Sequence, residues 1–95
     1  MAHRLLLSVA MITDKLKRFI TSELLQSDVK LDEDTLLLQS GTLTSLQTIG
    51  LVEFIQNEFG VEIEPEEISE REFKSLRTIG ALVTRKLQVA RGSVA

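Results

Sequence analysis

Two hydroxyl-bearing residues, Thr44 and Ser45, stand where a loop gives way to a helical pattern that runs to Phe59. With Gln47 three residues later, Thr44 predicts a capping box, in which its hydroxyl accepts a first-turn amide and Gln47 reaches back. Ser45 is then the first helical residue. Its hydroxyl is expected near the surface, beside free backbone N–H groups and the positive end of the helix dipole. A phosphate esterified to that oxygen would lie in a favourable field.

Three short motifs surround this serine. They are Ser40-Gly41-x-Leu43-x-Ser45-Leu46, Glu58-Phe59-Gly60-Val61-Glu62-Ile63 and Phe73-x-Ser75-Leu76. Together they resemble the acyl and peptidyl carrier proteins, over nearly the whole chain. The resemblance implies that Ser45 carries 4′-phosphopantetheine through a phosphodiester, and that the thiol of this arm holds acyl or aminoacyl groups as thioesters. A specialised lipid, polyketide or aminoacyl pathway is the expected setting.

The resemblance also implies the partners and a docking surface. A phosphopantetheinyl transferase would attach the arm, and loading and transfer enzymes with basic surfaces would use it. The helix after Ser45 would dock on them through Leu46, Ile49, Glu53 and Glu58. Both apolar residues also fall on the face that the helical spacing predicts to be buried, together with Val52, Ile55 and Phe59.

One position departs from the family pattern. Carrier proteins usually have Asp immediately before the modified serine, and this chain has Thr44. Thr caps a helix nearly as well, so the fold tolerates the change. The negative charge, which in the family helps the transferase bind its metal and substrate, is absent. The alternative function is therefore a vestigial carrier fold that binds proteins without the prosthetic group.

Composition excludes several other classes of protein. Ninety-five residues make one small domain, and no apolar run is long enough to span a membrane. The chain has no cysteine and a single histidine, His3, which we expect at the surface. No Ser-His-acid set, phosphate-binding glycine loop or metal-ligand spacing is present. We expect a monomeric cytoplasmic protein that is not an enzyme and binds no metal.

The charge is unevenly distributed along the chain. Residues 28–72 hold twelve acidic residues and only two bases, whereas residues 73–95 hold five bases and no acid. A nucleic-acid partner for the acidic part is excluded by its sign, and a basic protein surface is favoured. An ordinary solvated acidic face explains the same pattern.

The apolar periodicity predicts an all-α fold, a four-helix carrier-protein bundle of three main helices and one short one. We expect helices at residues 12–26, 45–59 and 76–89, with the short helix at 69–73. A long ordered loop between the first and second main helices, anchored by its leucines, would set Ser45 in place. The predicted domain organisation is an N-terminal extension at 1–11, the carrier domain at 12–90 and a flexible tail at 91–95.

Gly50 is unexpected inside the second main helix. A glycine inside a helix lowers its stability by about 1 kcal/mol relative to alanine. Its presence suggests that a side chain at this position would interfere with a contact. It either leaves a gap for a partner or for the arm, or it serves local packing. The sequence leaves both readings open.

Overall fold

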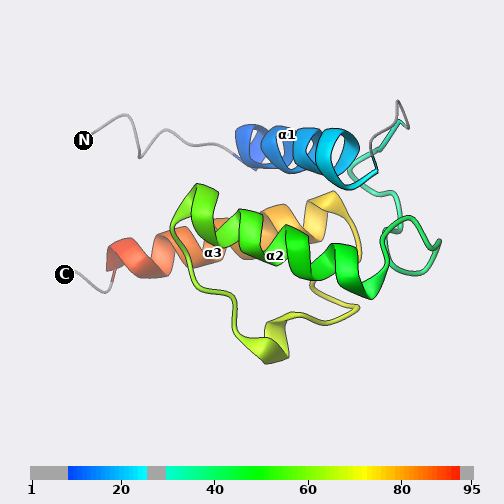
Figure 1. Ribbon diagram of the computed structural model, residues 1–95. Helices are drawn as coiled ribbons and strands as arrows, with labels where there is room; N and C mark the ends of the chain where they lie inside the picture. Colours follow the sequence, from blue (N-terminus) through cyan, green and yellow to red (C-terminus); the bar gives the residue numbers. More distant parts are fainter. Residues whose placement is uncertain (1–8, 26–29, 93–95) are drawn as a thin grey trace.

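The computed structural model describes residues 9–25 and 30–92, and this part of the chain is helical without any strand (Figure 1). His3, most of the expected N-terminal extension and residues 93–95 of the expected tail lie outside the described residues. The elements, in chain order, are α1 (Val9–Phe19), the π-helix η2 (Ile20–Leu24), α2 (Ser45–Phe59), the 3-10 helix η3 (Pro65–Glu67) and α3 (Leu76–Gly92). The predicted all-α fold is confirmed.

The outer helices are longer than the apolar spacing indicates. α1 begins at Val9, three residues before the predicted start, and α3 continues to Gly92, into the expected tail. Ala10 and Met11 favour helix, as do Ala90 and Arg91, and no proline or turn motif interrupts either end. Periodicity reports only where a helix is buried, so it misses helical turns that extend beyond the core.

The end of the first helical segment widens into a π-helix, which the sequence did not predict. Leu25 N–H donates to the Ile20 carbonyl at 2.8 Å, a bond that spans five residues. The Thr21 hydroxyl donates to the Lys17 carbonyl (2.9 Å), and the Ser22 hydroxyl to the Arg18 carbonyl (2.6 Å). Such back-bonding competes with the α-helical ladder and helps to open it.

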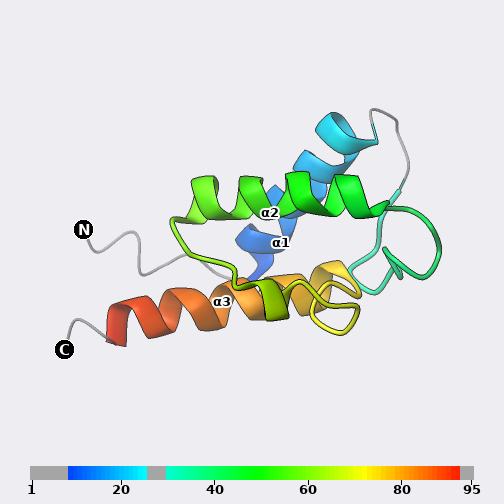
Figure 2. The same ribbon diagram turned by 60° about the horizontal axis from the view of Figure 1, so that its bottom comes forward.

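The three main helices enclose one core of aliphatic side chains and phenylalanines. α2 and α3 run in the same direction in both views, and α1 runs against them at a steep tilt (Figures 1 and 2). α1 packs chiefly on α3. The buried apolar residues are Ile12, Leu16, Ile20, Leu31, Leu37, Leu43, Leu51, Val52, Ile55, Phe59, Val61, Ile63, Phe73, Leu76, Ile79, Leu82 and Val83.

The short helix lies earlier than predicted. The helical turn is η3, whereas residues 69–73 form a turn closed by a bond from Phe73 N–H to the Ser69 carbonyl (2.9 Å). Pro65 sets the backbone for a helix start, and reciprocal bonds between Glu64 and Glu67 cap it. Phe73 lies in the core, at 1% exposure. A single turn held by Phe73 therefore replaces the helix predicted at 69–73.

The long loop between η2 and α2 is anchored to the start of α3. Leu37 N–H donates to the Lys74 carbonyl, and Arg77 N–H to the Glu33 carbonyl, each at 2.9 Å. The Arg77 side chain also binds the Asp34 carboxylate at 2.7 Å. This hydrogen-bonded guanidinium lowers the pKa of Asp34. The described part of the loop is thus ordered, as its leucines predict.

Within the described residues, no helix combines the length and the apolar character that crossing a membrane requires.

Candidate functional site

Ser45 opens α2 with its side chain exposed to solvent. Thr44 is the N-cap residue, in extended backbone conformation, and its hydroxyl accepts from Gln47 N–H at 3.1 Å. The Gln47 side-chain oxygen in turn accepts from Thr44 N–H at 2.9 Å. Thr48 N–H donates to the Thr44 carbonyl at 2.9 Å and completes the first turn. The predicted capping box is confirmed.

The residues immediately before Ser45 are fixed to the core. Gly41 adopts a φ of 80°, which glycine takes far more readily than other residues. The chain then turns inward, so that Leu43 is buried and its N–H donates to the Leu37 carbonyl at 2.9 Å. This buried leucine lies two residues before Ser45 and holds the approach to the helix.

The electrostatic field at Ser45 suits an anion. The first turn of α2 contains no acidic residue, and its first backbone amides have no partner within the helix. These N–H groups and the helix dipole place partial positive charge beside the Ser45 hydroxyl. A phosphate linked to that oxygen would meet this positive end and no neighbouring carboxylate in the same turn. An exposed serine hydroxyl therefore fits a phosphodiester here.

Leu46 and Ile49 lie on the solvent side of α2, and the prediction that they are buried is wrong. Leu46 is 78% exposed and Ile49 is 54% exposed. Glu53 lies on the same side, one turn after Ile49 and two turns after Leu46, and is exposed as well. The buried side consists instead of Thr48, Leu51, Val52, Ile55 and Phe59. Because α2 has apolar residues around most of its circumference, spacing alone did not select the correct face.

The sequence model of the phosphopantetheine attachment site family matches residues 14–85. This region contains α2, its cap and the anchored loop. The chain belongs to this family of carrier domains. The family carries a covalently attached 4′-phosphopantetheine, and its domains are typically not catalytic.

A comparison with solved structures supports the same assignment of fold. One similar chain comes from a structure titled "Crystal structure of FAD-dependent dehydrogenase", with a TM-score of 0.66 and 35% sequence identity. The match covers 72% of this chain and 97% of that chain, so the two are close in domain size. A comparison with curated proteins gives no significant match.

Glu58 of the carrier domain is placed apart from the other predicted docking residues. Its carboxylate forms an ion pair with Lys15 of α1 at 2.8 Å. Glu58 comes nine positions after Ile49, which places the two side chains about 180° apart around the helix axis. Glu58 therefore faces α1, whereas Ile49 and Glu53 face solvent. The structure brings Ser45, Leu46, Ile49 and Glu53 to one side of α2 and leaves Glu58 out of that group.

Gly50 lies beside Leu24 of η2. A Cβ at this position would meet Leu24 Cδ2 at 3.5 Å, an ordinary van der Waals distance. The space beside the glycine is thus lined by a leucine of η2. An alanine would fit here in ordinary contact with Leu24, so packing between η2 and α2 does not by itself require a glycine at position 50.

Several glutamates lie between α2 and α3, in residues 62–72, and some of them form ion pairs within the carrier domain. Glu67 contacts Lys86 at 2.6 Å, and Glu72 contacts Arg85 at 3.1 Å. The hydrogen bond from Lys86 lowers the pKa of Glu67, against a smaller opposing effect of burial. Glu66 and Glu70 remain exposed. These pairs join the connector before α3 to the helix itself, so the acidic stretch is partly structural.

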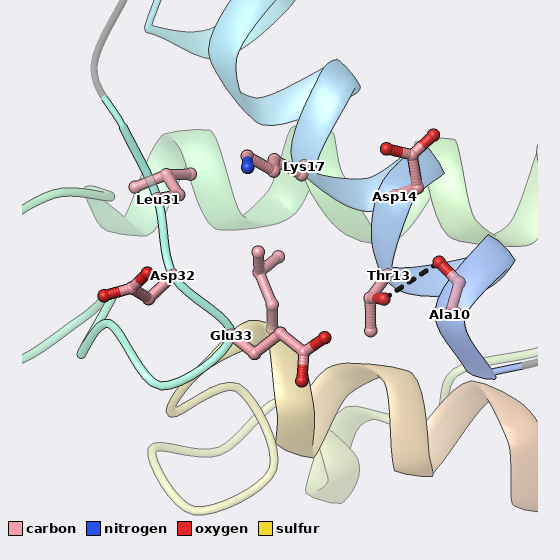
Figure 3. Close-up of a pocket in the computed structure, with 8 residues that line it drawn as sticks. Ala10, Thr13, Asp14, Lys17, Leu31, Asp32 and Glu33 are labelled. Carbon is pink, nitrogen blue, oxygen red and sulfur yellow. Dashed lines mark hydrogen bonds between the residues drawn. The ribbon is translucent and has the colours of Figure 1, made fainter.

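A pocket of about 280 Å³ lies on another side of the domain, between α1, the loop at 31–33 and Leu76 of α3 (Figure 3). It is lined by Ala10, Thr13, Asp14, Lys17, Leu31, Asp32, Glu33 and Leu76. The Thr13 hydroxyl donates to the Ala10 carbonyl, so it is already bonded. Across residues 9–25 and 30–92, no group of three or more metal-ligating side chains converges. Ser45 is not part of this pocket.

Proposed function

We propose that Ser45 is the attachment point of the phosphopantetheine arm, and that the protein presents acyl or aminoacyl groups to partner enzymes as thioesters. The observation that carries this proposal is the exposed Ser45 hydroxyl at the capped start of α2, inside the region that the family model matches. The arm supplies the thiol, since the polypeptide has no cysteine. The protein itself performs no catalysis and acts in the cytoplasm.

Attachment uses the geometry of the helix start. The Ser45 oxygen attacks the β-phosphorus of coenzyme A, its proton passes to a base of the transferase, and adenosine 3′,5′-bisphosphate leaves. Thr44 takes part only as the cap, because its hydroxyl is engaged by Gln47 N–H. It brings no charge for the metal of the transferase. We therefore expect attachment to be slower than in a Thr44→Asp variant, which keeps a capping oxygen and adds the charge.

We define the docking surface as Ser45, Leu46, Ile49 and Glu53. Two exposed aliphatic side chains and one carboxylate suit a partner with an apolar depression beside a single basic residue. Lys15 already neutralises Glu58, which therefore adds little to steering. A single basic residue is a smaller requirement than the basic partner surface that the sequence favoured.

An FAD-dependent dehydrogenase is one candidate partner. The support is the similarity to a chain of carrier-domain size in a structure whose title names such an enzyme. A flavin would accept a hydride from the β-carbon of the thioester-bound acyl group while a base takes the α-proton, leaving a double bond. Loading the arm with a saturated acyl group and incubating it with such an enzyme would then lower the acyl mass by two hydrogens.

The alternative is a carrier fold that has lost the arm and only binds proteins. Thr44, which stands where the family has Asp, is the observation that favours it. Incubation with coenzyme A and a broad-range phosphopantetheinyl transferase, followed by intact-mass measurement, separates the two. A gain of one phosphopantetheinyl unit supports the carrier. No gain in the natural chain, with modification restored in Thr44→Asp, supports the binding module.

A further inference from the structure

The side chain of Gln47 joins two helix ends that are far apart in sequence. Its amide oxygen accepts from Thr44 N–H at 2.9 Å, at the start of α2. Its amide nitrogen donates to the Leu24 carbonyl at 3.0 Å, at the end of η2. The Thr44 N–H can only donate and the Leu24 carbonyl can only accept, so the two partners fix the orientation of the amide.

The end of η2 supplies a free carbonyl for this bond. A helix leaves its last carbonyls without partners within the helix, and they need donors from elsewhere. In η2 the Ile20 carbonyl is taken by Leu25 N–H, whereas that of Leu24 is taken by the Gln47 amide. One amide group therefore satisfies an unpaired donor of one helix and an unpaired acceptor of another.

This double role explains why the residue is glutamine. A capping box accepts glutamate equally well at this position, and the helix dipole would favour its charge. Glutamate has no N–H to offer the Leu24 carbonyl, and its oxygen would face another oxygen. Beside this bond, the Leu24 side chain lies against Gly50. The backbone and the side chain of Leu24 thus both contact the first two turns of α2.

We propose that Gln47 is a positioning residue for Ser45, which fixes the helix start against η2 so that the Ser45 oxygen meets the phosphorus of coenzyme A in line. The inference rests on the proposed function, because it concerns the attachment step. Ser45 is two residues before Gln47 and one after Thr44, so both ends of the capping box constrain its backbone. A displacement of the nucleophile by about an ångström can cost a large factor in rate.

Gln47→Glu tests the proposal, because it keeps the oxygen that accepts from Thr44 N–H and removes the donor to the Leu24 carbonyl. Gln39→Glu is the matched control. Gln39 is exposed in the loop before the site, its side chain forms no hydrogen bond in the described residues, and the chemical change is the same. Steady-state phosphopantetheine transfer, with the carrier as the varied substrate, gives kcat and KM separately. Thermal unfolding reports on the fold.

We expect kcat for Gln47→Glu to fall roughly tenfold at a temperature where the variant is folded, with the KM for the carrier close to that of the natural chain. The unfolding midpoint should fall by about 4–8 °C, because the bond to the Leu24 carbonyl is lost. Gln39→Glu should keep the natural kcat. The nuclear Overhauser contact between the Leu24 methyl groups and the Gly50 α-protons should weaken in Gln47→Glu only. A natural kcat in Gln47→Glu, or an equal loss in Gln39→Glu, overturns the positioning role. Absence of transfer to the natural chain instead overturns the proposed function, and the two failures are distinct.

Discussion

Leu46 and Leu51 lie on opposite sides of α2: Leu46 is 78% exposed, whereas Leu51 is completely buried. Five residues along an α-helix correspond to about 140° around its axis. One leucine therefore belongs to the docking surface and the other to the core. The same residue type on the same helix serves recognition at one position and stability at the other.

This difference predicts separate effects of two identical substitutions. Leu51→Ala leaves a cavity in the core and should lower the free energy of unfolding by about 2–5 kcal/mol. Leu46→Ala removes an exposed side chain, so it should change that free energy by less than about 0.5 kcal/mol. Leu46→Ala should instead weaken transfer between the loaded arm and a partner enzyme. Urea unfolding of both variants, with a transfer assay on Leu46→Ala, measures these effects. A loss of stability in Leu46→Ala as large as in Leu51→Ala would contradict the assignment of faces.

Gly50→Ala should stabilise the protein. The new methyl group would meet Leu24 at an ordinary contact distance, and alanine is favoured over glycine in a helix interior by about 1 kcal/mol. Attachment of the arm should proceed at the natural rate if Gly50 has no role in admitting a partner or the arm.

Gly41→Ala provides the comparison, measured by the same urea unfolding. There the backbone has a φ of 80°, so alanine should destabilise the protein by roughly 1 kcal/mol even though space is open. Destabilisation by Gly50→Ala would show that the contact with Leu24 is tighter than the structure indicates. Slower attachment at unchanged stability would instead support the hypothesis that Gly50 leaves a gap for a partner.

The ion pair between Glu67 and Lys86 predicts a pH dependence of stability. The hydrogen bond from Lys86 lowers the pKa of Glu67 below its ordinary value of 4.5. Between the folded and unfolded pKa values the unfolded chain binds more protons, so stability rises with pH in that range. This contribution is fully present above about pH 4.5 and is lost as the pH falls through the lower, folded value.

Urea unfolding of Glu67→Gln and Glu66→Gln tests this assignment. It is measured between about pH 3 and pH 6, because carboxylates titrate in this range. Glu67→Gln should flatten the decline of stability in acid. Glu66→Gln, which removes an exposed carboxylate without an ion pair in the described residues, should follow the natural chain. Equal curves for the two variants would mean that the pair with Lys86 contributes nothing measurable.

The sequence predicted those features that depend on neighbouring residues. The capping box of Thr44 and Gln47 and the bounds of α2 were predicted and are confirmed, and Gly60 ends the helix with a φ of 68°. Each arises within one or two turns, where residue type and spacing determine the hydrogen bonds. The short helix was predicted at 69–73, whereas the structure has it at Pro65–Glu67. Pro65 begins this helix, and the turn that ends at Phe73 was interpreted as the helix instead.

Features that depend on distant contacts were not predicted. The bond between Gln47 and Leu24 joins residues 23 positions apart, and nothing local distinguishes it from an ordinary cap. The same is true of the ion pair that draws Glu58 towards Lys15. The exposed side of α2 was misassigned because Leu46 and Ile49 are as apolar as the residues that pack. A glutamine where glutamate would serve the cap equally well was the one available signal for the contact with Leu24.

The central claim is that the Ser45 oxygen alone carries the phosphopantetheine arm. The most direct measurement is the intact mass of the natural chain, Ser45→Ala and Ser40→Ala after incubation with coenzyme A and a broad-range transferase. Ser40 is the matched control, since it is an exposed serine in the loop just before α2. We predict one added phosphopantetheinyl unit in the natural chain and in Ser40→Ala, and none in Ser45→Ala. An added unit that persists in Ser45→Ala would contradict the account.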